Sequence, residues 1–152
     1  SKAAYGAFTG AKLPALYASG VPDGPYRPSP ENFLERAARG ISGPVEFPLT
    51  VIPLFPLPFM NYFLMRLGPL GKALTALTAS RRSFINYVLH DHELLAAEDF
   101  SGARTGSGLT AAWLGKDLAG RINFIEYTLR TLKRSHSFAT LETYAGEIRA
   151  AG

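Results

Sequence analysis

The fold class is decided by Ser83-Phe84-Ile85-Asn86-Tyr87-Val88-Leu89-His90-Asp91-His92-Glu93-Leu94. The apolar first half predicts a buried strand over 84–89, and the second half ends that strand at a cluster of titratable side chains. The chain has three histidines, and two of them, His90 and His92, lie in this cluster. Because buried strands of α/β folds commonly end at functional sites, the cluster is the first candidate for chemistry.

The composition of the 152 residues, 47% hydrophobic and 18% charged, is that of a globular chain and argues against a disordered one. We therefore expect a single domain over 1–152 with a buried core. There is no cysteine, so disulfides and thiolate metal sites are excluded. The net charge of +4 is spread along the chain without interleaved stacking aromatics, so we expect no nucleic-acid partner.

The start of the chain, from Ser1, shows no signal-peptide pattern. It resembles the middle of a longer protein, and we expect a fragment or a processed piece. Compartment and oligomeric state are not indicated by the sequence.

Strand and helix signals alternate along the chain and favour α/β layering. We expect a helix from Ser29-Pro30-Glu31 to about Arg39, because a cap oxygen, a proline and an acid stand at its start. Pro48 makes the strand predicted over 44–52 an edge or irregular strand. The further helices are predicted over 61–80, interrupted at Gly68-Pro69, over about 118–134, and after the cap Thr140.

The helix predicted over 118–134 carries apolar residues at spacings of four, three, four and three. Such a period places them on one side of a helix, which we expect to face the core. These residues are Leu118, Ile122, Ile125, Leu129 and Leu132.

The segment 47–65 contains no charged residue, a length that would suit a membrane span. Four prolines within it would break such a helix, so we predict no single transmembrane helix. An apolar wall over a groove, or a surface in contact with a membrane, remains open. Its aromatic residues either form core or line a carbohydrate or lipid groove. They are Phe55, Phe59, Tyr62 and Phe63.

Three interpretations of the histidine cluster remain open. Residues two apart on a strand point the same way, so His90 and His92 could bind a divalent metal with help from Glu93, Asp99 or His136. One histidine could instead be a general acid, favoured as imidazolium by a neighbouring carboxylate. Both could also be solvated loop residues.

Two other candidate sites are disfavoured by their patterns. The glycine-rich 101–108 lacks the Gly-Lys-Ser/Thr ending of a phosphate-binding loop, so we expect a flexible connector there. The chain also has no Gly-x-Ser-x-Gly elbow for a serine nucleophile.

Four short motifs follow one another over roughly 25–150: Pro25-Tyr26-Arg27-Pro28-Ser29, Val45-Glu46-Phe47-Pro48-Leu49-Thr50, Leu89-His90-Asp91-His92-Glu93-Leu94 and Phe138-Ala139-Thr140-Leu141-Glu142. Their order resembles the C-terminal half of the polysaccharide deacetylase (NodB-like) family. The resemblance implies an α/β fold that is part of a distorted, incomplete (β/α) barrel. It also implies a metal-dependent hydrolase that removes acetyl groups from a carbohydrate by cleaving a carbon–nitrogen (amide) bond.

The resemblance also implies roles for single residues. Leu89-His90 matches the late family motif, which makes His90 the catalytic proton donor. We take Leu89, Glu93 and Tyr62 as substrate-binding residues; Glu93 matches the acid three positions after the histidine. Asp91 stands where many relatives have proline, and His92 has no fixed family role.

The family's metal, usually zinc, implies an Asp-Asp pair and a His-x-x-x-His, and neither motif occurs in this sequence. We therefore expect the chain to be the C-terminal part of a larger catalytic domain and to be inactive alone. The alternative function is a non-catalytic glycan- or membrane-surface-binding module, with membrane contact through 47–65. A small metalloprotein using His90, His92 and a carboxylate is the third hypothesis.

Overall fold

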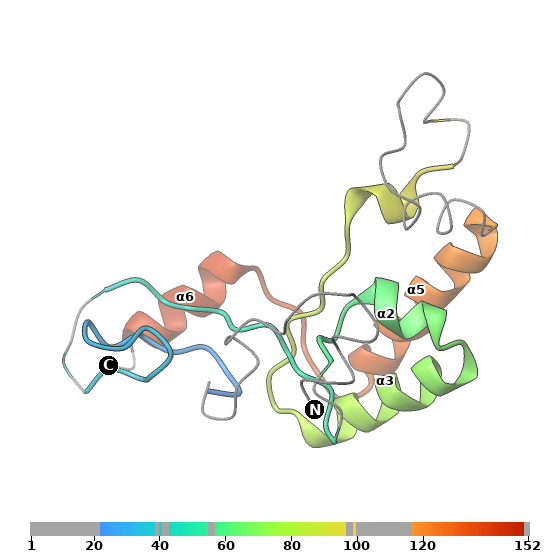
Figure 1. The fold of residues 1–152 in the computed structure, drawn as a ribbon. Helices are drawn as coiled ribbons and strands as arrows, with labels where there is room; N and C mark the ends of the chain where they lie inside the picture. The colour runs from blue at the N-terminus through green and yellow to red at the C-terminus, as the bar shows by residue number, and fades with distance from the viewer. Residues whose placement is uncertain are drawn as a thin grey trace.

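The computed structural model describes residues 22–38, 40, 43–54, 57–96, 99 and 117–150. Its elements, in chain order, are α2 (Asn61–Arg66), α3 (Pro69–Arg81), the short 3-10 helix η2 (Asp91–Leu94), α5 (Leu118–Lys133) and α6 (Leu141–Ala150). Helices α2, α3 and α5 lie together, while α6 lies apart from them at the other end of several extended segments (Figure 1).

The main core lies where α3 packs against α2 and α5. The approach of α2 to α3 is so close that a Cβ on Gly71 would stand 1.8 Å from the backbone oxygen of Leu64. Gly68, at φ +56°, makes the turn between these two helices, in the left-handed region that glycine adopts without strain. The buried core cluster contains Ile52, Phe59, Leu64, Met65, Leu74, Ala79, Phe124 and Leu132.

The two segments predicted as strands, 44–52 and 84–89, lie side by side in extended conformation. Side chains connect them: the Asn86 backbone N–H donates to Thr50 Oγ1 over 2.7 Å, and Asn86 Nδ2 donates to the Phe47 carbonyl over 3.2 Å. Prolines at 48, 53 and 58 have no N–H to donate to a ladder. Pairing among the described residues is accordingly confined to isolated bridges, such as Met60 with Val88.

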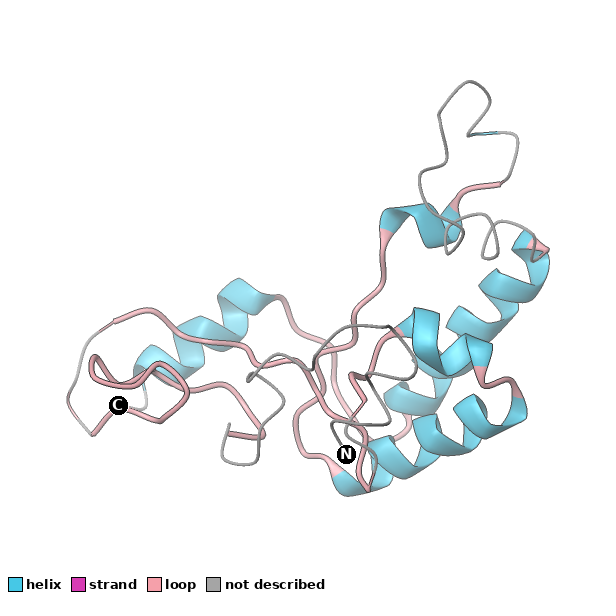
Figure 2. Ribbon diagram, in the orientation of Figure 1, coloured by secondary structure: helices cyan, strands magenta, loops and turns pink. Residues whose placement is uncertain are grey.

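The part of the chain that the structure describes is therefore mixed but mostly helical, and it contains no sheet and no barrel (Figure 2). Extended backbone and helices alternate as the sequence predicts. The predicted helices over 61–80, about 118–134 and after Thr140 are all present. Thr140 caps the last of them, since its Oγ1 accepts from the Thr143 N–H over 3.1 Å.

The helix predicted from Ser29-Pro30-Glu31 to about Arg39 is wrong over the described residues 29–38, which contain no helix. The chain instead turns back at 33–34, and the Ala37 N–H donates to the Arg27 carbonyl over 2.7 Å. The Asn32 side chain accepts from the Leu34 N–H over 3.1 Å, a local bond that competes with a helical turn. Ser29 still caps the start of this turn, because its Oγ accepts from the Glu31 N–H.

The core-facing side of α5 also differs from the prediction. Ile122 and Leu129, expected in the core, are 39% and 38% exposed. Compared with the prediction, the helix is rotated about its axis, and its buried side includes polar residues. The spacing of apolar residues alone does not reveal them. The buried residues of α5 are Arg121, Phe124, Ile125, Thr128 and Leu132. Among the helices described, none has the length and apolar character needed to cross a bilayer.

Candidate functional site

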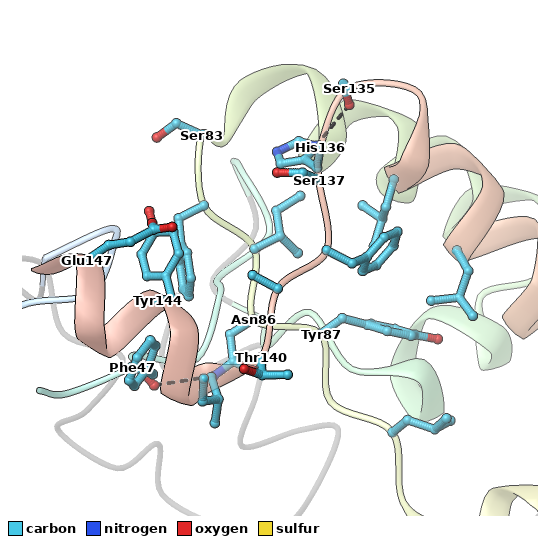
Figure 3. A pocket seen from close by; sticks show the side chains of 18 residues that line it. Phe47, Ser83, Asn86, Tyr87, Ser135, His136, Ser137, Thr140, Tyr144 and Glu147 are labelled. Carbon is cyan, nitrogen blue, oxygen red and sulfur yellow. Dashed lines mark hydrogen bonds between the residues drawn. The ribbon is translucent and has the colours of Figure 1, made fainter.

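A groove of about 640 Å³ lies between α6 and the extended segment 83–89 (Figure 3). Its lining comes from parts of the chain far apart in sequence: Phe47, the segment 83–89, the end of α5 and the stretch 135–147. The aromatic members are Phe47, Phe84, Tyr87, Phe138 and Tyr144. Aromatic walls with a few polar groups are typical of small-molecule and sugar sites.

Three half-buried rings form one wall of the groove. The centroid of Phe84 lies 5.6 Å from that of Tyr144 and 6.3 Å from that of Phe47. These separations are in the range of favourable aromatic packing. The wall is positioned by Asn86, whose side-chain amide donates to the Phe47 and Pro48 carbonyls and so fixes the two extended segments.

His136 lines the opposite part of the groove (Figure 3). Its Nε2 lies 2.8 Å from the Arg82 carbonyl oxygen, and its Nδ1 lies 2.9 Å from Ser135 Oγ. A carbonyl only accepts, so Nε2 carries the proton of that bond. Both ring nitrogens are thus engaged within the protein, and the imidazole joins the end of α5 to the end of α3.

The side chains of Leu89 and His90 point to opposite sides, because successive side chains alternate along an extended segment. Leu89 lines the groove, whereas His90 is exposed and is not among the lining side chains. The backbone of His90 also starts η2, since its carbonyl accepts from the Glu93 N–H over 3.0 Å. The expected proton donor therefore stands directly after a groove residue, at a chain turn.

Glu93 lies in the interior, with an exposed fraction of 0%. Asn61 Nδ2 donates to Glu93 Oε2 over 2.6 Å, and Asn61 Oδ1 accepts from the Tyr87 hydroxyl over 2.7 Å. Arg121 of α5 donates to the backbone carbonyls of Glu93 and Leu95 over 3.3 and 2.7 Å. This polar network, formed by Asn61, Tyr87, Glu93 and Arg121, holds η2 and α5 against α2.

The surroundings of the polar network raise the pKa of the Tyr87 hydroxyl. Burial is the main cause that raises the pKa of Tyr87 far above its usual value, and the negative charge of Glu93 raises it further. The neighbouring Thr128 hydroxyl lowers this pKa by a smaller amount. Tyr87 therefore stays protonated and donates to Asn61. The buried position of Glu93 supports a structural role, and its predicted substrate contact stays a prediction.

Tyr62 lies on α2, away from the groove, and packs half-buried against the core. Its hydroxyl accepts from Arg66 over 2.8 Å, and the Arg66 guanidinium stands 5.5 Å from the ring centroid. The structure thus does not bring Tyr62 together with Leu89 in this groove. Phe59 and Phe63 of the same aromatic set are buried, which confirms the core interpretation for them. Phe55 lies outside the described residues.

The donor sets predicted for a metal are not assembled in the part of the chain that the structure describes. No group of three or more histidines, aspartates or glutamates there could hold an ion. His136 is held by Ser135 and Arg82, and Asp99 accepts from the Ala96 N–H over 2.7 Å. The His92 side chain and the glycine-rich segment 101–108 lie outside the described residues. The described residues therefore do not fit the zinc that the resemblance implies.

The three groove residues of α6 were not singled out as site residues by the sequence. Leu141, Tyr144 and Glu147 follow one another at intervals of three on α6, and all three line the groove. The spacing marks one helix side, but only the tertiary structure places that side against Phe47 and Phe84. Comparisons with protein-family models, curated proteins and solved structures found no match.

Proposed function

We propose that this chain is the downstream part of a polysaccharide deacetylase-like hydrolase, to which it contributes a sugar-binding groove and, at the edge of that groove, the proton donor His90, whose exposed side chain lies outside the groove lining. The observation that carries the proposal is the aromatic groove, in which Leu89, the residue before His90, is a lining residue together with Phe47. The extended segments 44–52 and 84–89 would then be neighbouring strands of an incomplete (β/α) barrel.

The shape and chemistry of the groove support a carbohydrate ligand. Sugars present flat C–H faces that pack on aromatic rings, and hydroxyls that need polar partners. The groove offers rings on one wall, and Ser83, Ser137 and Thr140 provide exposed hydroxyls among its lining. A volume of about 640 Å³ lies within the usual range for small-ligand sites.

The chemistry proposed for His90 is general acid catalysis. Hydrolysis of an acetamide breaks the carbon–nitrogen bond, and the leaving nitrogen must take up a proton to depart as an amine. An imidazolium at His90 would donate that proton and become neutral. The family's metal would supply activation of the attacking water, and the residues that would hold it would belong to the upstream part of the longer protein.

The experiment is a deacetylation assay with an N-acetylglucosamine oligomer on the chain extended upstream, with His90→Ala compared against the unaltered protein. Loss of a positioned general acid should lower the rate by about 10²–10⁴-fold. Asn123→Ala is the control, because Asn123 is exposed on α5 and is not among the groove-lining residues. Unchanged turnover in His90→Ala, or an extended chain without the metal motifs, would contradict the proposal.

A second candidate, binding to a membrane surface, is favoured by Leu54. This residue is 84% exposed and has φ 69°, the only positive φ at a non-glycine among the described residues. The chain turns back around it, with the Ile52 N–H donating to the Leu57 carbonyl over 2.9 Å. A bulky residue at this φ is strained, and such outliers point to function.

Vesicle co-sedimentation tests this candidate. Leu54→Gly relieves the backbone strain and removes the apolar tip, so it should keep the fold and weaken binding to phosphatidylcholine–phosphatidylserine vesicles. Leu70→Ala, at an exposed leucine of α3, is the control. If Leu54→Gly co-sediments as the unaltered chain does, Leu54 is not a membrane contact.

A further inference from the structure

We propose that the groove prefers a sugar unit with a protonated amino group, the product of the proposed deacetylation, over the acetylated unit. This inference rests on the proposed function. It adds that the groove retains the deacetylated sugar unit in its protonated form. The residue assigned to this preference is Glu147 of α6, which nothing in the sequence marks as a site.

The charge of the groove is the first observation. Among the residues that the structure describes, no lysine or arginine lines the groove. Glu147 is the one carboxylate in this described lining. A lining with a carboxylate and without such cations is complementary to a cationic ligand and unfavourable to an anionic one.

The position of Glu147 relative to the rings is the second observation. Tyr144 and Glu147 lie beside each other on α6, and both line the groove (Figure 3). Phe47 and Phe84 both pack on Tyr144, at centroid distances of 6.4 and 5.6 Å. Ammonium groups bind at aromatic faces through the ring quadrupole, and a nearby carboxylate adds to that attraction.

The described lining also contains the titratable side chains of Tyr87, Tyr144 and His136. His136 does not contribute to the attraction of a cationic ligand. Its two ring nitrogens are engaged with Arg82 and Ser135. The acetylated unit is neutral, so it would gain ring packing in the same groove but no attraction to Glu147. The two ligands should therefore differ in affinity by the contribution of this carboxylate.

Calorimetric titration of the chain with a glucosamine tetramer and with an N-acetylglucosamine tetramer tests the proposal. At about pH 7, an amine with a pKa near the α-amino value of about 7.7 is mainly protonated. We expect tighter binding of the amine form, and we expect Glu147→Gln to weaken it by roughly two- to five-fold, the size of an exposed ion pair. The affinity for the acetylated tetramer should not change.

The matched control is Glu142→Gln, the same substitution on α6 at an exposed glutamate outside the groove lining. It should leave both affinities unchanged. Equal affinity for the two tetramers, or equal weakening by the two substitutions, would overturn the amine preference while leaving a sugar groove in place. Failure of both tetramers to bind would overturn the sugar groove as well. Tyr144→Ala should weaken both tetramers, since it removes ring packing common to them.

Discussion

Asn61 Nδ2 donates a hydrogen bond to Glu93 Oε2 over 2.6 Å in the interior, where both side chains are 0% exposed. The bond links the first residue of α2 to η2, which are 32 residues apart in the chain. It also fixes the turn that directly follows His90. A catalytic role for His90 therefore depends on a buried contact that does not involve the histidine itself.

Replacing Asn61 by alanine should destabilise the protein. The substitution leaves a buried carboxylate without this donor, and hydrogen bonds to charged groups contribute about 1.5–3 kcal/mol. We expect a decrease of that size in the free energy of unfolding in urea. Asn123→Ala, on the exposed side of α5, should change stability by less than about 0.5 kcal/mol. Equal effects of the two substitutions would contradict a stabilising role for the Asn61–Glu93 bond.

Gly71 should not tolerate a methyl group. A Cβ there would lie 1.8 Å from the Leu64 carbonyl oxygen, so α2 and α3 would have to separate. We expect Gly71→Ala to lower the free energy of unfolding by about 1–3 kcal/mol, as other overpacked sites do. At Gly146 of α6 nothing lies within 4 Å of an added Cβ. Gly146→Ala should stabilise by roughly 0.5–1 kcal/mol, and a stabilising Gly71→Ala would disprove the close approach.

The raised pKa of Tyr87 predicts a loss of stability in alkali. The unfolded phenol ionises near its ordinary value of 10.0, whereas the folded phenol, held mainly by burial, does not. Above that pH the unfolded state binds fewer protons than the folded state, so stability falls as the pH rises further. Tyr87→Phe should be less stable at neutral pH by about 1 kcal/mol, because it loses the bond to Asn61.

The slope of the unfolding free energy against pH distinguishes ionisation of Tyr87 from a general alkaline destabilisation. Urea unfolding at several pH values above 10.0 should show a shallower fall for Tyr87→Phe than for the unaltered chain. Tyr26, whose pKa is also raised by burial and by Glu46, keeps its share of the slope in both proteins. Identical slopes would exclude Tyr87 as a source of the alkaline loss.

The rotation of α5 is tested by two truncations. Phe124 is buried in the core cluster, so Phe124→Ala should cost about 3–5 kcal/mol of unfolding free energy. Ile122 is 39% exposed, so Ile122→Ala should cost about 1 kcal/mol or less. If Ile122→Ala lowered the unfolding free energy more than Phe124→Ala, the core-facing side of α5 would be the one predicted from the apolar spacing.

The sequence determined the elements whose signals are local. Gly68-Pro69 separates α2 from α3, and the Thr140 hydroxyl starts α6, because turn and cap chemistry acts between near neighbours. The prolines of 44–58 prevented a regular strand there, as Pro48 predicted. At Ser29-Pro30-Glu31 the start signal was also present, yet pairing between 27 and 37 replaced the helix, because a non-local contact outweighed a weak preference.

Only the tertiary structure decided which side chains meet. The sequence predicted Glu93 as a substrate-binding residue and did not single out Arg121, but both are buried because they find partners far along the chain. Asn61 donates to the Glu93 carboxylate across 32 residues, and Arg121 donates to the Glu93 carbonyl across 28. Glu147 reads as an ordinary exposed residue of a helix, and it lines a groove because α6 packs beside Phe47 and Phe84. Local periodicity fixes the side of a helix but not what that side contacts, and the contacts depend on long-range packing.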